Sequence, residues 1–256
     1  CPTHLHMYAP DEMPGIIKRA QEAGVGYIVA AGTTLDSSRA CIQMTADYSI
    51  MYGGVGIHPM EARDPVDDEL YRTLEALAKS SSKVVCISEV GRDFLPVPPS
   101  HTLQYQVFRQ HIRAAMSLRL PIIFHSRESH PEVFKTLREE QAGDVGGVMH
   151  YFQADETTAR EAIDCGFFIS LARPLLRLPE LQETAKAIPL DNIVLETDAA
   201  PQPFKKYRHN WTEPRHVKAV AEKLAELKNI TLEEVTQTTS KNLTKLLGLE
   251  HLAASH

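Results

Sequence analysis

Short apolar runs recur along the chain, and most of them lead directly into a polar residue that can take part in chemistry. The clearest run is Ile193, Val194 and Leu195, which is followed by Glu196 and Asp198. A run of this length beside turn-forming residues predicts a short buried parallel strand. A carboxylate at the end of such a strand must be hydrogen-bonded, paired or bound to a cation, because burying it alone costs too much free energy.

Strand-like runs alternate with helical patterns along the whole chain. Strands are predicted at 3–6, 27–31, 51–57, 84–88, 121–124, 147–149, 167–170 and 193–195. Helices are predicted at 14–24, 36–48, 67–80, 102–118, 131–140, 156–165, 178–187, 214–227 and 231–247. Such alternation produces parallel strands joined by helical crossovers. Eight units in 256 residues predict an α/β fold, a single (β/α)8 TIM-like barrel with an additional C-terminal helix.

The domain organisation is simple. No linker, charge block or low-complexity stretch divides the chain, so residues 1–256 are interpreted as one barrel domain. An open doubly wound sheet is the alternative fold, but it requires a glycine-rich phosphate loop after its first strand. The glycine cluster at 53–56 lies inside a strand pattern and lacks the spacing of that loop. The barrel is therefore the favoured prediction.

The carboxyl ends of all strands of a barrel face one mouth, so residues that follow the strands converge there. Residues of metal-ligand type occupy these positions and the N-terminal segment: His4, His6, Glu89, His125, His150 and Asp198. Each alone has an ordinary interpretation as a packing or surface residue, but their coincidence indicates one site. Four imidazoles and two carboxylates are too many ligands for one tetrahedral cation, and they suit two divalent ions that share a carboxylate. Nitrogen and oxygen ligands without thiolates are compatible with Zn, Mn, Mg, Fe or Ni.

Composition restricts the partners. A hydrophobic content of 43% and a charged content of 23% are ordinary for a globular protein. The net charge of −6 predicts no bulk attraction to nucleic acid or an anionic membrane, so a phosphate-bearing substrate must be bound locally. No apolar run is long enough to span a bilayer, no signal peptide is visible, and no obligate protein partner is indicated. The widely spaced cysteines fit a reducing cytoplasm, and the start at Cys1 is expected to reflect trimming or processing.

Seven short motifs follow one another along nearly the whole chain. They are His4-Leu5-His6, Gly56-Ile57-His58-Pro59, Glu89-Val90-Gly91-Arg92-Asp93-Phe94, His125-Ser126-Arg127, His150-Tyr151-Phe152, Glu196-Thr197-Asp198-Ala199 and Glu213-Pro214. In this order the set resembles the TatD-related metal-dependent deoxyribonucleases of the amidohydrolase superfamily. The resemblance implies a TIM-like barrel, a binuclear metal centre and phosphodiester hydrolysis. It also implies that one ion is bound by His4, His6 and Asp198 and the other by His125 and His150, with Glu89 bridging.

The chain departs from the pattern of this family at several positions beside the motifs. Pro2 stands where the family usually has Asp, and Ala154 where it usually has Gly. Ser88, Val90 and Arg92 replace the usual residues around the bridging Glu. All six proposed ligands are retained, so these changes bear on substrate preference more than on metal binding.

Residues beyond the predicted strand ends are candidates for substrate contact. For phosphate groups they are Arg92, Arg127, Lys205, Lys206 and Arg208, and Trp211 is a candidate to stack on a nucleobase. His58 has two interpretations. In the first, its side chain orients a phosphate or protonates a leaving group. In the second, it is a turn residue whose position is fixed by Pro59.

The leading hypothesis is a metal-dependent deoxyribonuclease that cleaves phosphodiester bonds from DNA ends or single strands. A hydroxide that bridges the two ions attacks phosphorus, and Asp198 orients or deprotonates the water. One alternative is an amidohydrolase-type esterase, amidase or deacylase with the same metal site. Another is a binding protein that kept the barrel and lost turnover, although the intact ligand set argues against it.

Overall fold

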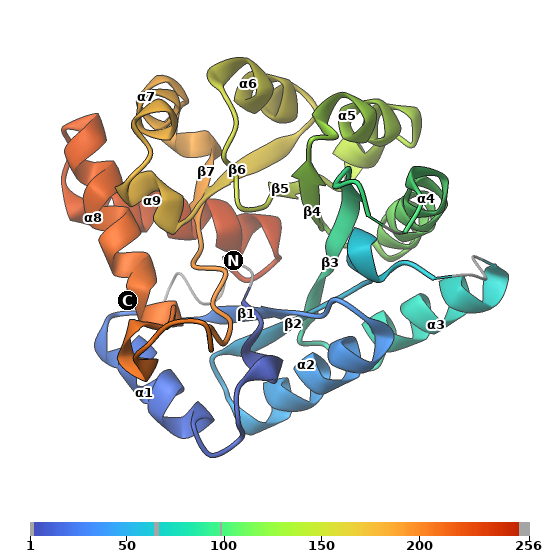
Figure 1. Ribbon diagram of the computed structural model, residues 1–256, viewed down its shortest axis with the longest axis horizontal. Helices are drawn as coiled ribbons and strands as arrows, with labels where there is room; N and C mark the ends of the chain where they lie inside the picture. The colour runs from blue at the N-terminus through green and yellow to red at the C-terminus, as the bar shows by residue number, and fades with distance from the viewer. Residues whose placement is uncertain (1–2, 64–66, 98, 251–256) are drawn as a thin grey trace.

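The computed structural model describes residues 3–63, 67–97 and 99–250, and its centre is a curled parallel sheet (Figure 1). Pro2 and Cys1, on which two expectations rest, lie outside these residues. Seven strands follow one another in chain order. They are β1 (Ile28–Ala31), β2 (Met51–Val55), β3 (Val84–Asp93), β4 (Ile122–Arg127), β5 (Gly147–Met149), β6 (Phe167–Leu171) and β7 (Ile193–Leu195). Every neighbouring pair is parallel, as the alternation predicted.

The predicted strand at 3–6 is not formed among the described residues, so the eight-strand count is not confirmed. Thr3 makes isolated parallel bridges to Ala30 and Ala199, and the chain then turns into a 3₁₀ helix over Leu5–Met7. The amide of Met7 donates to the carbonyl of His4 at 3.0 Å, which closes this turn. The segment has no apolar run of its own to extend the pairing, and local turn hydrogen bonds form instead.

Helices connect the strands and surround the sheet (Figure 1). They are α1 (Met13–Glu22), α2 (Leu35–Asp47), α3 (Asp68–Lys79), α4 (His101–Leu118), α5 (His130–Glu139), α6 (Glu156–Asp164), α7 (Pro179–Ala187), α8 (Val217–Lys228) and α9 (Leu232–Leu246). All nine predicted helices are present near their expected bounds. None of the described helices is both long and apolar enough to cross a bilayer.

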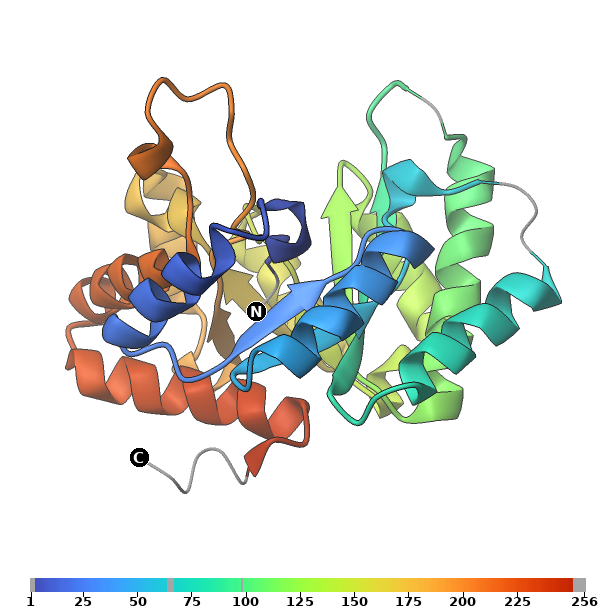
Figure 2. The same cartoon turned by 90° about the horizontal axis from the view of Figure 1, so that it is seen from below.

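The additional helix α9 lies under the amino ends of the strands, along the lower edge of the molecule in Figure 2. Its Leu243 belongs to the same buried cluster as Val29, Ile123 and Val148 from three strands. This helix begins where the Thr231 side chain accepts a hydrogen bond from the amide of Glu234 at 3.1 Å. Since this end of the sheet is covered by apolar packing, the chemistry is confined to the opposite end.

Strand β3 is longer than predicted and contains a bulge. The strand was expected to end at Ser88, but pairing with β4 continues to Asp93. Its register shifts between Ile87 and Val90, so one extra residue is inserted opposite β4. Glu89 therefore lies inside an irregular strand, where a bulge changes the direction of its side chain.

The continuation of β3 depends on Gly91. This residue has a φ of 140° and pairs with His125. A side-chain carbon at Gly91 would lie 2.0 Å from the carbonyl oxygen of His125. An L residue is strained at this φ, so only glycine allows β3 to follow β4 beyond the bulge.

We expect Gly91→Ala to lower the free energy of unfolding by about 3 kcal/mol or more, through backbone strain and the clash with β4. The measurement is the urea midpoint. Gly15→Ala in α1 is the matched control, because its added carbon meets only the flexible tip of Arg19 at 3.1 Å. The control should leave stability unchanged or raise it by about 0.5–1 kcal/mol. Equal midpoints for the two variants would contradict the role of Gly91.

Candidate metal centre

Three proposed ligands meet at the carboxyl ends of the strands. His4 Nε2 lies 3.4 Å from Glu89 Oε1 and 3.2 Å from Asp198 Oδ1. One ligand atom from each residue lies within 4.8 Å of the others, which is the spacing expected of groups that share a cation. His4 comes from the N-terminal bridge segment, Glu89 from the β3 bulge and Asp198 from the loop after β7. Residues far apart in the sequence thus form one cluster.

His150 completes this cluster from the end of β5. Its Nε2 lies 3.2 Å from Glu89 Oε1 and 4.0 Å from Asp198 Oδ1. Its Nδ1 lies 2.7 Å from Glu196 Oε2, and the other oxygen of Glu196 accepts the amide hydrogen of Tyr151 at 2.6 Å. A neutral ring that donates from Nδ1 to Glu196 keeps the lone pair of Nε2 toward Glu89, which is the form that binds a metal.

The buried atoms of the cluster fit a cation. Glu89 is 3% exposed, and within the described chain Glu89 Oε1 and Asp198 Oδ1 are buried without a hydrogen-bond partner. Carboxylate oxygens in that condition carry a desolvation cost, which a divalent ion offsets. The available donors are imidazole nitrogen and carboxylate oxygen. This donor set fits the metals expected from the sequence.

Charges inside the cluster compensate one another strongly. Burial raises the pKa of Glu89, but His150 and His4 outweigh it and hold this pKa well below its usual value. Burial lowers the pKa of His150, yet Glu196 and Glu89 raise it to about 10. Without a metal, protons on the imidazoles thus balance the carboxylates. A bound cation takes over that role, so binding releases protons.

His125 lies in a neighbouring group with a residue whose role the sequence analysis missed. Its Nε2 lies 2.9 Å from Asp93 Oδ2, and Arg127 Nε lies 3.6 Å from the same oxygen. Asp93 is 1% exposed. Both Asp93 and Glu196 stand in the quoted motifs, but only the folded structure shows that each one binds a proposed histidine ligand.

His58 contacts this second group. Its ring centroid lies 4.6 Å from that of His125, and its Nδ1 accepts the amide hydrogen of Met60 at 3.2 Å. Burial, and then His125, lower the pKa of His58 to about 3. The ring is therefore neutral with its hydrogen on Nε2. His58 is a turn residue and also part of the pocket wall, and its contact with a phosphate or a leaving group stays a prediction.

His6 lies beside the cluster rather than in it. Its ring is 5.9 Å from that of His4 at an interplanar angle of 88°, and its Nδ1 lies 3.4 Å from Cys41 Sγ. In the strand predicted at 3–6, side chains two residues apart, such as those of His4 and His6, would point to the same side. A 3₁₀ turn does not repeat every two residues, so the two rings diverge.

Comparisons with known proteins agree with these motifs. Residues 2–248 match the family described as TatD related DNase. This chain belongs to that family. The metal-dependent hydrolase YabD of Bacillus subtilis (strain 168), named as uncharacterized, is 34% identical over 255 residues, which cover 96% of this chain and 98% of that protein. The human deoxyribonuclease TATDN3 is 30% identical over 265 residues, which cover 97% and 95%.

A solved structure supports the fold. YJJV, a TatD homologue from Escherichia coli K12, matches with a TM-score of 0.86 at 24% identity over 96% of each chain.

Residues that depart from the TatD family pattern lie in the core here. Ser88 and Val90 are fully buried, and Ala154 packs against the main core cluster. These three departures change packing behind the site rather than its exposed wall.

The ligand cluster opens into a pocket of about 680 Å³. It is lined by five of the proposed ligands, by three apolar side chains, and by Thr33, His58, Glu61, Ser126, Arg127, Glu128, His130, Tyr151 and Gln153. Of the described lysines and arginines, only Arg127 lines it. Glu61 and Glu128 are acidic, so the pocket wall is not a continuous positively charged surface.

Arg92 does not reach this pocket. It is 9% exposed, its guanidinium lies 4.7 Å from the ring centroid of Phe94, and it donates to the carbonyl of His101 at 3.2 Å. Burial lowers its pKa. Arg92 therefore packs within the wall behind β3, and its proposed phosphate contact has no support from this placement.

The other proposed substrate contacts lie in the loop after β7, which rises on the mouth side of the sheet (Figure 2). Arg208 pairs with Glu12 and Glu213 and packs over Trp211 with 4.5 Å between guanidinium and ring. Lys205 donates to the carbonyl of Asn210 at 2.9 Å. The structure places Lys205, Lys206, Arg208 and Trp211 outside the pocket wall.

We expect Zn²⁺ or Mn²⁺ at about 100 times its Kd to stabilise the protein by about 2.7 kcal/mol, or roughly 5–10 °C in Tm, because the folded site binds the ion. Chelation should reverse this. His4→Ala should lose most of the shift, whereas His209→Ala, on an exposed position, should keep it. An unchanged Tm across the metal titration would contradict a metal centre here.

Proposed function

We propose that this protein is a metal-dependent deoxyribonuclease that cleaves phosphodiester bonds at DNA ends or in single strands. The observation that carries the proposal is the position of Glu89 Oε1, buried without a hydrogen-bond partner between His4 and His150. A buried carboxylate oxygen without a hydrogen-bond donor from the protein is well suited to bind a cation. Support for a DNA substrate comes from the family and from the relative named deoxyribonuclease TATDN3.

Two divalent ions would share Glu89 as a ligand. His4, His6 and Asp198 would hold one ion, and His125 and His150 the other; His6, which lies beside the cluster, would have to turn toward His4. When bound, such ions lower the pKa of a water molecule and neutralise charge on phosphoryl oxygens. For His125 to hold the second ion, its Nε2 atom would first have to give up its hydrogen bond to Asp93.

The side chains of this chain supply binding and proton transfer. Asp198, with its side chain 28% exposed, accepts a proton from the attacking water as the new bond to phosphorus forms and the bond to the leaving oxygen breaks. Arg127 binds a non-bridging phosphate oxygen. With a pKa of about 3, the ring of His58 is neutral and cannot protonate a leaving group. Its Nε2 hydrogen donates a hydrogen bond to the phosphate instead.

The charge of the pocket limits the form of DNA that it accepts. One lining arginine and two acidic side chains cannot neutralise a long duplex. An end or a single strand presents one phosphate to the recessed ligands and needs little neutralisation elsewhere. The alternative function is an amidohydrolase-type esterase, amidase or deacylase. It is tested by the rate assays described below, with acyl esters in place of DNA.

Glu89→Gln should lower kcat on oligonucleotides at least ~10³-fold, because a neutral amide cannot share two cations. The control is Glu128→Gln, which alters an acidic residue of the same pocket wall outside the cluster and should keep activity within about threefold. Circular dichroism and Tm should show that both variants are folded. Full activity of a folded Glu89→Gln variant with normal metal content would contradict the proposed mechanism.

Arg127→Ala should raise KM for a single-stranded oligonucleotide and reduce the salt slope of log KM by about one, since one phosphate contact is lost. Lys206→Ala, in the loop outside the pocket wall, should change neither quantity. The assay is initial rates over a salt series with oligonucleotide and closed circular duplex. Efficient cutting of the closed circle, or equal effects of the two variants, would contradict the proposed capture of ends and single strands.

A further inference from the structure

Two polar side chains are buried on the face of α4 that packs against β3. Gln104 and His111 are both fully buried, and they lie two helical turns apart, so they point to the same side of the helix. Their neighbours on this face, Val107, Phe108 and Ile112, belong to the apolar core. A polar side chain in such surroundings is costly unless its polar atoms have partners.

Gln104 holds the end of β3. Its Oε1 accepts the amide hydrogen of Asp93 at 2.8 Å, and its Nε2 donates to the carbonyl of Asp93 at 2.9 Å. The side chain of Asp93 in turn lies 2.9 Å from Nε2 of His125. The carboxamide of Gln104 therefore fixes the backbone whose side chain contacts His125.

His111 makes the equivalent contact with the segment that follows β2. Its Nε2 accepts the amide hydrogen of Ile57 at 3.1 Å, and its Nδ1 lies 2.7 Å from the carbonyl oxygen of Val107. A carbonyl only accepts and an amide only donates, so the ring carries its hydrogen on Nδ1 and directs the lone pair of Nε2 to Ile57. Burial lowers the pKa of His111 to about 4, so the ring stays neutral near pH 7.

Three consecutive amides after β2 have partners outside the sheet. The amide of Gly56 donates to Ser38 Oγ on α2 at 3.1 Å, and the amide of His58 donates to the carbonyl of Thr33 at 2.9 Å. The amide of Ile57, between them, donates to α4. Each contact fixes one successive peptide unit, and the contact of Ile57 is the one supplied by an imidazole.

His58 is the side chain that this segment carries into the pocket. It directly follows Ile57, lines the pocket wall and lies 4.6 Å, ring to ring, from His125. The proposed function gives its Nε2 hydrogen a contact with the phosphate. Such a contact depends on direction, so a rotation of the peptide between Ile57 and His58 would weaken it.

We propose that His111 is a positioning residue for His58: through the amide of Ile57, it fixes the peptide unit from which the His58 ring enters the pocket. Together with Gln104, which holds the contact of His125, it makes α4 the support of both rings. His111 itself does not touch the substrate. The kinetic effect of His111 rests on the proposed function, whereas its effect on the geometry of His58 does not.

The test compares two substitutions of similar length. His111→Gln retains an acceptor oxygen for the amide of Ile57, whereas His111→Met offers only a thioether, which is a weak acceptor. His111→Met should lower kcat/KM for a single-stranded oligonucleotide about tenfold, and His111→Gln should stay within about threefold of the original chain. Gln104 still anchors α4 in both variants, so both should fold, and circular dichroism checks this.

A double substitution separates positioning from a general loss of stability. In the His58→Ala background, His111→Met should change kcat/KM by less than about twofold, because the ring that it positions is absent. A purely structural role would lower kcat/KM by the same factor in both backgrounds.

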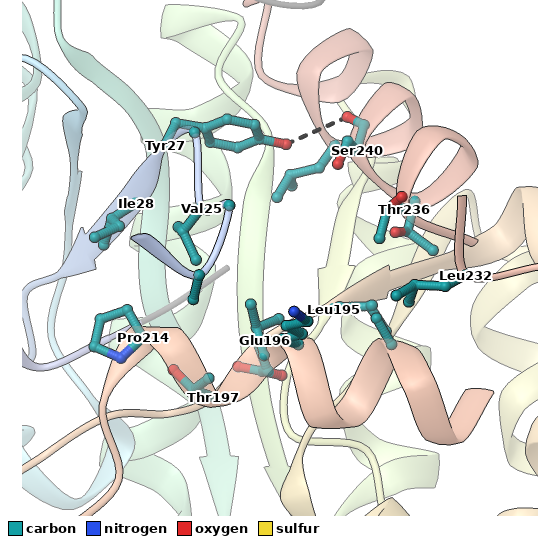
Figure 3. Close-up of a pocket in the computed structure, with 18 of the residues that line it drawn as sticks. Val25, Tyr27, Ile28, Leu195, Glu196, Thr197, Pro214, Leu232, Thr236 and Ser240 are labelled. Carbon is teal, nitrogen blue, oxygen red and sulfur yellow. Dashed lines mark hydrogen bonds between the residues drawn. The ribbon is translucent and has the colours of Figure 1, made fainter. Parts of the chain in front are cut away.

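Two further variants serve as controls for stability. Ile112→Val, beside His111 in the core, should lower Tm by about 2–5 °C without changing kcat/KM. Tyr27→Phe removes the hydrogen bond from the Tyr27 hydroxyl to the carbonyl of Ser240 at 3.3 Å, which joins the start of β1 to α9 (Figure 3). It should also leave kcat/KM unchanged.

Amide exchange and histidine NMR test the geometry without any substrate. Exchange at Ile57 should be about tenfold faster in His111→Met and within about threefold of the original in His111→Gln. The ring signals of His58 should shift in His111→Met and stay in place in His111→Gln. If the original chain cleaves no DNA, the proposed function fails, and these two measurements still decide the role of His111. Equal exchange and equal His58 signals in the two variants, or independent kinetic effects of His111→Met and His58→Ala, would overturn the proposal.

Discussion

The site depends on one buried carboxylate that has no internal hydrogen-bond partner for its inner oxygen. Glu89 occupies the bulge of β3, and the bulge needs space on β2. A side-chain carbon at Gly56 would lie 2.1 Å from the carbonyl oxygen of Ser88. Gly56, which directly follows β2, therefore allows β3 to approach closely and to turn Glu89 toward the mouth. Packing of two backbones thus fixes the position of a functional group.

The histidines around Glu89 are oriented by two further carboxylates rather than by bulk packing. Glu196 binds His150 at 2.7 Å, and Asp93 binds His125 at 2.9 Å. Each acid is almost fully buried, and each is compensated by its histidine and by backbone amides. The proposed DNA substrate would depend on bound cations for most of its charge neutralisation, because the protein is acidic and Arg127 is the one lysine or arginine of the described chain that lines the pocket.

Local patterns were sufficient to predict the seven strands from β1 to β7, the helices and most of the convergence at the mouth. His150 and Asp198 follow short apolar runs, and the position of such runs is encoded by neighbouring residues. The bulge at Glu89 was not predicted, because its register depends on β2 and β4. The environment of Arg208 was also missed, since its partner Glu12 lies at the other end of the chain. The strand at 3–6 failed for the same reason: pairing there is set by Ala30 and Ala199 rather than by its own sequence.

The meeting of the two ends of the chain has a consequence for the timing of activity during synthesis. His4 and Asp198 lie 3.2 Å apart, the hydroxyl of Tyr8 donates to the carbonyl of Thr212 at 2.6 Å, and Arg19 pairs with Glu213 at 2.8 Å. Most other contacts of the sheet join strands that are neighbours in the sequence, so they form as the chain emerges. A nascent chain therefore has most of its fold before it has a complete ligand set. Hydrolytic activity appears only when translation has passed residue 198, so a truncated product is inactive.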